Sequence, residues 1–155
     1  MKRKSASFDQ SQPTKGGPPI VTSPLVEVRN SPVHGRGVFA VAPIAKGTRI
    51  IEYLGDRVSH AAADARYEDH DESDNHTFLF IVDKHTVIDA GVGGNDARFI
   101  NHACKPNCYI HIYGGTIWIR AARTIRKGEE LTYHYNTDGE GLIKCRCRPG
   151  CQHLI

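Results

Sequence analysis

Three cysteines fall within seven residues near the end of the chain, at Cys145, Cys147 and Cys151. This spacing suits a short loop that wraps its sulfur atoms around a tetrahedral metal ion. Zinc would need a fourth ligand, and Cys104 or Cys108 could supply it, because both lie in one His-Ala-Cys-Lys-Pro-Asn-Cys loop. Four sulfur ligands leave no open position for water, so the pattern predicts a structural site. Structural thiols without a metal are the alternative.

Two further stretches combine residue types that bind ligands. The first is a Gly-x-Gly within residues 34–37, His-Gly-Arg-Gly, where the backbone can approach a ligand closely. It lacks the third glycine and the following helix of a dinucleotide-binding fold, so by itself it favours an ordinary turn. The second, residues 98–107, gathers amide, imidazole and thiol groups in the order Arg-Phe-Ile-Asn-His-Ala-Cys-Lys-Pro-Asn.

Short β-strands must position these stretches. Alternating or β-branched runs bounded by turn residues predict strands at 25–28, 38–41, 49–54, 78–82, 86–89, 109–113, 116–120 and 131–135. Gly114-Gly115 predicts a two-residue hairpin between two of them. One helix is expected over 59–67, with Ser59 as its N-cap. Many short strands without a βαβ rhythm predict a mainly β fold of small curved sheets with a short helix.

The overall composition indicates one domain. The chain has 155 residues, 39% of them hydrophobic, which is enough for a core of its own. No run of about 18 apolar residues predicts a membrane span, and no apolar stretch follows the basic start as in a secretory signal. We therefore expect an intracellular protein, in the cytoplasm or on chromatin or a nucleoid. In that setting the five cysteines favour metal binding over disulfides.

The formal charge of +3 belongs to the first 24 residues, which carry four basic side chains against Asp9. The remaining chain is neutral. Residues 1–24 are rich in Ser, Gln, Gly and Pro, which predicts a disordered basic leader. Nucleic acid is expected to bind, if at all, only through this leader.

Six segments together resemble the SET domain of protein-lysine methyltransferases, in order and in content. They are residues 34–40 (His-Gly-Arg-Gly-Val-Phe-Ala), 51–56 (Ile-Glu-Tyr-Leu-Gly-Asp), 87–90 (Val-Ile-Asp-Ala), 98–107, 128–135 (Gly-Glu-Glu-Leu-Thr-Tyr-His-Tyr) and the cysteine tail. The resemblance covers residues 25–155. It implies a SET domain over 25–138 and a post-SET zinc-binding tail over 139–155.

The resemblance implies a SET fold with a pseudoknot-like C-terminal threading, in which residues 128–135 pass against the Asn-His loop. Such threading is rare in proteins. It would bring Asn101, His102 and Tyr135 together although they are far apart in the sequence.

The resemblance also implies methyl transfer from S-adenosylmethionine to a lysine. The expected cofactor-binding positions are His34, Gly35, Arg36, Gly37, Arg98, Asn101, His102, Tyr135 and Leu154. The expected catalytic set is Tyr135 with Tyr53 and Tyr133. The lysine channel would be walled by Tyr53, Phe78, Phe80 and Tyr133. Structural zinc would be bound by Cys104, Cys145, Cys147 and Cys151, with Cys108 left over.

The chemistry explains why aromatic residues would be needed. A lysine amine attacks only when neutral, and with a pKa near 10.4 only about 0.1% is neutral at pH 7.4. An aromatic channel desolvates the ammonium group and lowers its pKa. A tyrosine hydroxyl with a pKa near 10 is a poor general base, so Tyr135 is expected to position and stabilise. The resemblance places Tyr133 where tyrosine or phenylalanine sets the number of methyl groups in the family; its hydroxyl would hold a water molecule or the amine, which predicts mainly mono-methylation.

The substrate is expected to be a basic protein segment, from a histone or another basic protein. Six carboxylates between Asp64 and Asp74 fall in the insert that walls the peptide groove of the family, and they would complement such a segment. An ordinary solvated loop explains them equally well. One departure is the spacing of Cys147 and Cys151, with three residues between them where the family usually has four. A non-catalytic SET module that binds a protein partner is the competing function.

Overall fold

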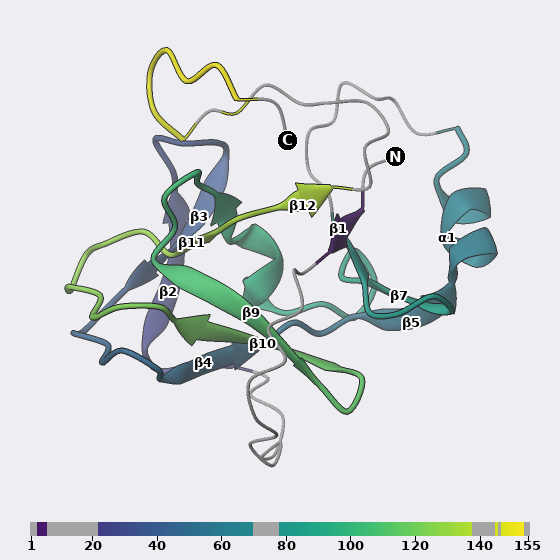
Figure 1. The fold of residues 1–155 in the computed structure, drawn as a ribbon, viewed down its shortest axis with the longest axis horizontal. Coiled ribbons are helices and arrows are strands. Elements are labelled where there is room, and N and C mark those ends of the chain that lie inside the picture. The colour runs from purple at the N-terminus through teal and green to yellow at the C-terminus, as the bar shows by residue number, and fades with distance from the viewer. Residues whose placement is uncertain (1–2, 6–21, 70–77, 138–144, 146, 154–155) are drawn as a thin grey trace.

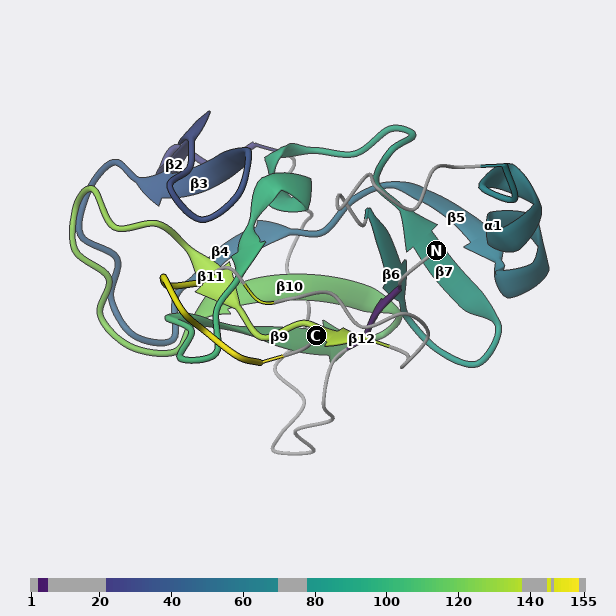
Figure 2. The ribbon, with the colours of Figure 1, turned by 90° about the horizontal axis from the view of Figure 1, so that it is seen from above.

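The computed structural model describes residues 3–5, 22–69, 78–137, 145 and 147–153. Figures 1 and 2 show short strands arranged in small sheets, with one helix at the edge of the molecule. The N-terminal elements are β1 (Lys4–Ser5), β2 (Val26–Asn30), β3 (Arg36–Ala40), β4 (Arg49–Glu52), β5 (Asp56–Ser59) and α1 (His60–Arg66). The central elements are β6 (Leu79–Ile81), β7 (Thr86–Asp89), the 3-10 helix η1 (Asp96–Phe99) and β8 (Asn101–His102). The last elements are β9 (Cys108–Tyr113), β10 (Thr116–Ala121), β11 (Thr132–Tyr133) and β12 (Asn136–Thr137).

Within these described residues the strands form four sheets. The largest has the order β12-β1-β6-β7-β5, the second is β4-β10-β9, and two strand pairs are β11-β8 and β2-β3. The sheets enclose a common core of aliphatic side chains with Tyr53, Phe80 and Tyr133 among them. This confirms the expected mainly β fold with one short helix. No helix of the described chain is long and apolar enough to cross a membrane.

Local signals in the sequence explain several elements. Gly114 and Gly115 both have positive φ angles, of 57° and 78°, and they join β9 to β10 as the predicted two-residue hairpin. The helix α1 begins after Ser59, whose side chain accepts a hydrogen bond from the backbone of Ala62 at 3.1 Å. The strand predicted at 86–89 is β7.

The strand β5 was not expected, because the predicted strand at 49–54 ends before it and no strand was predicted at 56–59. A Cβ atom at Gly55 would lie 2.4 Å from the backbone oxygen of Asp89. The glycine therefore lets the chain pass close to β7, and Asp56–Ser59 continues as an antiparallel partner of that strand.

A larger difference lies at Lys4–Ser5. A disordered leader was expected over residues 1–24, but β1 pairs antiparallel with β12 and parallel with β6. Figure 1 shows β1 beside β12, although the two come from opposite ends of the colour scale. Residues 1–2 and 6–21 lie outside the described part of the chain, so the expected disorder there stays a prediction.

The segment 128–135 runs between β3 and β8. On one side, the backbone of Leu131 donates to Val38 at 2.7 Å and Ala40 donates to Glu129 at 2.9 Å. On the other side, β11 pairs in parallel with β8, with Thr132 opposite Asn101 and Tyr133 opposite His102. The chain near residue 133 is thereby held against the Asn-His loop, as the resemblance implied.

Candidate active site and metal centre

Three tyrosine rings surround the amine of Lys4. The Nζ atom lies 5.0 Å from the ring centre of Tyr53, 5.8 Å from that of Tyr133 and 4.8 Å from that of Tyr135. We call these three rings the tyrosine cage. The Lys4 side chain is fully buried, and its Nζ lies 3.4 Å from the Tyr53 hydroxyl oxygen. Cations are attracted to the faces of aromatic rings, so the cage is suited to a lysine side chain.

The strands and loops around the cage hold its rings in place. Tyr53 follows β4, and its hydroxyl donates to the backbone oxygen of Phe78 at 2.9 Å. The Tyr135 hydroxyl donates to the backbone oxygen of Ile100. Phe80 lies behind the cage, with its ring centre 5.1 Å from Tyr53. Since two of the hydroxyl protons are directed at carbonyl groups, the Tyr53 oxygen can accept a hydrogen bond from the amine.

Burial dominates the electrostatics of the cage. It lowers the pKa of Lys4 from its ordinary value near 10.5 to about 7. It also raises the pKa values of Tyr53, Tyr133 and Tyr135, so these side chains stay neutral at physiological pH. The cage therefore favours a neutral amine and offers no phenolate to take up a proton.

Asn101 connects the Gly-x-Gly turn to the 128–135 segment. Its Nδ2 lies 3.1 Å from the His34 oxygen, 3.0 Å from the Arg36 oxygen and 2.8 Å from Oε1 of Glu130. A Cβ atom at Gly37 would lie 2.3 Å from the same Glu130 carboxylate oxygen. The second glycine therefore makes room for a carboxylate of the chain itself.

His102 is the link between the Asn-His loop and Tyr135. Its Nδ1 accepts a hydrogen bond from the backbone of Tyr135 at 2.9 Å, and its Nε2 lies 3.6 Å from Sγ of Cys104. Burial, with smaller effects from His134 and His153, lowers the pKa of His102 to about 4. The imidazole is thus neutral and can act as an acceptor.

Two arginines lie against one aromatic ring beside this loop. The Arg36 guanidinium is 4.9 Å and the Arg98 guanidinium 4.7 Å from the ring centre of Phe99. Arg98 also donates to the Ala90 oxygen at 3.2 Å, while its buried Nε has no partner among the described residues. Phe78, expected in the channel wall, packs edge-on against Phe99 with ring centres 6.1 Å apart and contributes its carbonyl to Tyr53.

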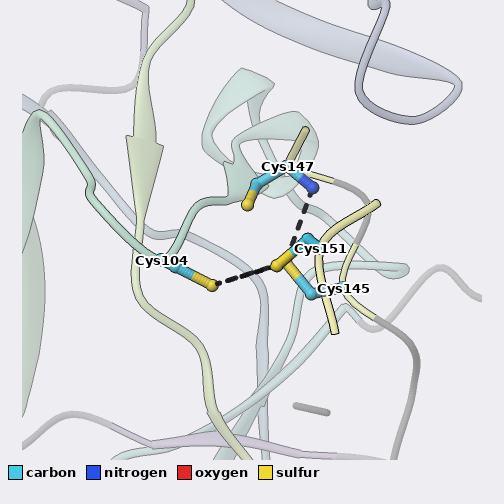
Figure 3. A group of neighbouring side chains, drawn as sticks. All are labelled: Cys104, Cys145, Cys147 and Cys151. Carbon is cyan, nitrogen blue, oxygen red and sulfur yellow. Dashed lines mark hydrogen bonds between the residues drawn. The ribbon is translucent and has the colours of Figure 1, made fainter. Parts of the chain in front are cut away.

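Four cysteines form a possible metal centre. The sulfur atoms of Cys104, Cys145, Cys147 and Cys151 all lie within 4.8 Å of one another, and Figure 3 shows the four side chains grouped together. Cys104 Sγ is 3.6 Å from Cys145 Sγ and 3.8 Å from Cys151 Sγ. Sulfurs bound tetrahedrally to zinc at about 2.3 Å would be about 3.8 Å apart. The donor set and its spacing therefore fit zinc.

The fifth cysteine, Cys108, is not part of the four-cysteine group. Cys108 lies in β9 within the hydrophobic core, where burial raises the pKa of its thiol to about 12. It is therefore the cysteine left out of the group. Leu154, expected near the cofactor, lies outside the described residues.

Some residues of the site had no signal in the sequence. Ser31 donates from its hydroxyl to both carboxylate oxygens of Glu130, at 2.7 and 2.8 Å, across 99 positions of sequence. Asn107 donates from Nδ2 to the Glu130 backbone oxygen at 2.8 Å and accepts from the Thr132 backbone at 2.9 Å. Lys4 was counted only as part of a basic leader. No local pattern separates these side chains from ordinary loop residues.

The fold and the site together define a β-rich domain that holds a lysine side chain in a tyrosine cage and has a four-cysteine group whose Cys104 lies two residues after His102. A family model described as "SET domain" matches residues 35–136. The chain belongs to the SET-domain family.

Curated relatives match most of this chain. It is 40% identical over 135 residues to "Histone-lysine N-methyltransferase, H3 lysine-4 specific" of Mycosarcoma maydis. That match covers 81% of this chain and 9% of that protein. It is 40% identical over 129 residues to "Histone-lysine N-methyltransferase 2B" of Homo sapiens, with 79% and 5% covered. The match to "Histone-lysine N-methyltransferase trithorax" of Drosophila melanogaster has 41% identity over 127 residues, with 79% and 3% covered. The chain thus spans less than a tenth of the length of these relatives.

Proposed function

We propose that this chain is an S-adenosylmethionine-dependent protein-lysine N-methyltransferase that acts on a basic protein segment, with histones as the first class of substrate and chromatin as its location. One observation carries the proposal: a lysine amine is seated among three tyrosine rings and has a pKa of about 7. Half of such amines are neutral at about pH 7, whereas free lysine is almost entirely charged. The names of the relatives agree with this chemistry.

The residues of the chain would prepare the amine for transfer. Burial in the cage favours loss of the ammonium proton to water before transfer. The Tyr53 oxygen then orients the amine by accepting one of its N–H bonds, and the Tyr135 ring stabilises the cation that forms on methylation. None of the three tyrosines acts as a general base, because their pKa values are raised.

The polar groups around Asn101 fit the cofactor. The buried Nε of Arg98, without a partner among the described residues, is a donor for an acceptor such as a carboxylate. We assign cofactor binding to the 34–37 turn, Arg98, Asn101, His102 and Tyr135, the positions expected from the family. When bound, S-adenosylmethionine supplies a methyl group on a positively charged sulfur.

Zinc is the ion that we assign to the four cysteines. Its role would be structural, because four sulfur ligands complete its coordination. The ion would tie the tail at Cys145, Cys147 and Cys151 to Cys104, two residues after His102. We retain a SET domain over 25–138 and a zinc-binding tail over 139–155 as part of the proposal.

Transfer of a labelled methyl group to histones and to basic peptides tests the proposal. We expect transfer by the parent chain, and a loss of roughly 100-fold or more in kcat for Tyr135→Phe, because a positioned hydroxyl is removed from the reacting groups. Tyr109→Phe is the matched control, since Tyr109 is exposed on β9. Its activity should equal that of the parent.

The same assay separates the enzyme from a non-catalytic binding module. If the chain binds S-adenosylmethionine, as measured by calorimetry, but labels no lysine in a broad panel of basic proteins, the enzyme proposal fails. Binding of a protein partner without transfer would then be the function of the module.

A further inference from the structure

The residue in the tyrosine cage belongs to the chain itself. We propose that Arg3-Lys4-Ser5 occupies the substrate seat and that Lys4 is methylated by the active site of its own molecule. This inference rests on the proposed methyltransferase function and names one substrate of that site. The chemical class of the acceptor is a lysine amine that follows an arginine in an extended segment.

The backbone is the first part of the argument. In the order β12-β1-β6, Lys4 lies opposite Thr137 on one side and Phe80 on the other. Neighbouring strands are about 4.8 Å apart, so β12 and β6 leave between them a slot one strand wide. An extended peptide fills such a slot by backbone hydrogen bonds, largely independently of its side chains. The short strand β1 is therefore placed as a bound peptide would be.

The Lys4 side chain is the second part. It is fully buried, and its Nζ is within 5.8 Å of all three ring centres of the cage. None of the carboxylates in the described chain forms an ion pair with it. A structural buried lysine would need such a partner to offset the loss of hydration. Contact with neutral rings and one hydroxyl suits an amine that must lose its proton.

Arg3 is the third part, because it anchors the residue before Lys4. Its guanidinium pairs with the Asp64 carboxylate of α1, and it lies 3.1 Å from Nδ1 and 3.2 Å from the backbone oxygen of His60. The Arg3 side chain is only 13% exposed. The helix α1 thus binds the Arg3 side chain, and the tyrosine cage binds the Lys4 side chain. Together these contacts fix the register of the segment.

Methyl transfer to Lys4 would follow the same steps as transfer to any lysine amine. The Lys4 ammonium first loses a proton to water. Its nitrogen lone pair forms a bond to the methyl carbon, and the carbon–sulfur bond of the cofactor breaks with its electron pair left on sulfur. Lys4 and the active site belong to the same chain, which raises the effective concentration of Lys4 at the site to roughly millimolar. The reaction should therefore be intramolecular.

Seating of Lys4 can be measured without any transfer. We would pulse the full chain, in the absence of S-adenosylmethionine, with an amine-acylating reagent and compare Lys4 with the exposed Lys46 and Lys84 by mass spectrometry. We expect Lys4 to react at least roughly tenfold more slowly, because burial protects its amine. Equal labelling of the three lysines would overturn the proposal.

Self-methylation is measured next, on the same chain with S-adenosylmethionine and an external basic peptide. We expect methyl-Lys4 to form with a rate constant that does not change with protein concentration. Arg3→Ala should slow this reaction roughly tenfold, since it removes the charged anchor. The exposed Arg126→Ala is the matched control and should leave the rate unchanged. Lys4→Arg should abolish the signal at this position.

The other outcomes distinguish this inference from the proposed function. If the external peptide is methylated but Lys4 is not, self-methylation is wrong and the enzyme proposal stands. If Lys4 is methylated with a rate constant that rises with protein concentration, the intramolecular assignment is wrong. If neither lysine is methylated, both proposals fail.

Discussion

The Tyr133 hydroxyl, part of the tyrosine cage, is buried and has no hydrogen-bond partner among the described residues. A buried hydroxyl without a partner is costly unless a ligand or water satisfies it. The Lys4 amine in the cage leaves this hydroxyl without a partner among the described residues, so a water molecule beside the substrate amine is the group that can do so. This agrees with the interpretation of Tyr133 as the residue that limits the number of methyl groups.

Replacement of this hydroxyl should change the product. We expect the parent chain to form mainly mono-methyl lysine and Tyr133→Phe to form di- and trimethyl lysine, because the space and the hydrogen bond of the hydroxyl are released. Mass spectrometry of a methylated peptide over time measures this, with Tyr109→Phe as the unaffected control. Abundant trimethyl lysine from the parent chain would show that the Tyr133 hydroxyl does not limit the product.

The protonation of Lys4 gives a second test. Its pKa in the cage is about 7, below the value of 10.5 in water, so the caged state binds fewer protons between these values. Seating of Lys4 therefore strengthens as pH rises through this window and is weakest below about pH 7. The groups that face Nζ are Tyr53, Tyr133 and Tyr135, which stay neutral because their pKa values are raised.

We expect the rate of Lys4 methylation to rise with pH and to level off above about pH 8, which is far below the pKa of free lysine. The measurement is a series of initial rates by mass spectrometry from pH 6 to 9.5 at constant ionic strength. A rate that still climbs steeply at the alkaline end would mean that the cage does not lower the pKa of the amine.

Among the elements, the 128–135 segment depends on a few side chains that bind it from both sides. Asn107 is 4% exposed, and its amide satisfies the Glu130 carbonyl and the Thr132 N–H. These two hydrogen bonds tie the segment to the loop that precedes β9 and so help to place Tyr133 and Tyr135.

Asn107→Ala would leave two buried backbone groups without partners. We expect a loss of about 2–4 kcal/mol in the free energy of unfolding, since each such group costs about 1–3 kcal/mol. Urea denaturation with zinc held constant measures this loss. Asn30→Ala, at an exposed position of β2, should change the stability by less than about 0.5 kcal/mol. Similar values for both variants would show that Asn107 does not hold the segment.

Prediction of the elements from the sequence succeeded where the information is local. The glycine pair of the β9–β10 hairpin and the Ser59 cap of α1 act on neighbouring residues, so their sequence alone specifies them. The two-residue strands β1, β8 and β12 are too short for an alternating pattern. They exist because a distant partner supplies their hydrogen bonds.

At the level of the whole molecule, the cysteine group joins the tail to the loop that carries His102. The described tail contains no helix or strand, and a metal ion would contribute bonds that a short loop cannot replace. Assembly of the site is therefore expected to depend on the ion.

Removal of the metal should lower both the stability and the activity. We expect one zinc per chain by elemental analysis, and a strong chelator should lower Tm by several degrees and abolish methyl transfer. Added zinc should restore both. Cys151→Ser should reduce the bound zinc, whereas Cys108→Ala should retain it because Cys108 lies in the core. Unchanged Tm and activity after complete removal of the metal would exclude this role.

The sequence alone determined the mainly β fold, the hairpin, the helix cap, the likeness to the SET family and the cysteine spacing, all of which depend on residue types at short range. The tertiary structure brought Cys104 to the three tail cysteines, and it decided how Glu130 joins Ser31 to Asn101 and that Lys4 lies among the rings of Tyr53, Tyr133 and Tyr135. These contacts join residues far apart in the chain. They form only when burial and strand pairing bring distant segments together, so no local pattern can encode them.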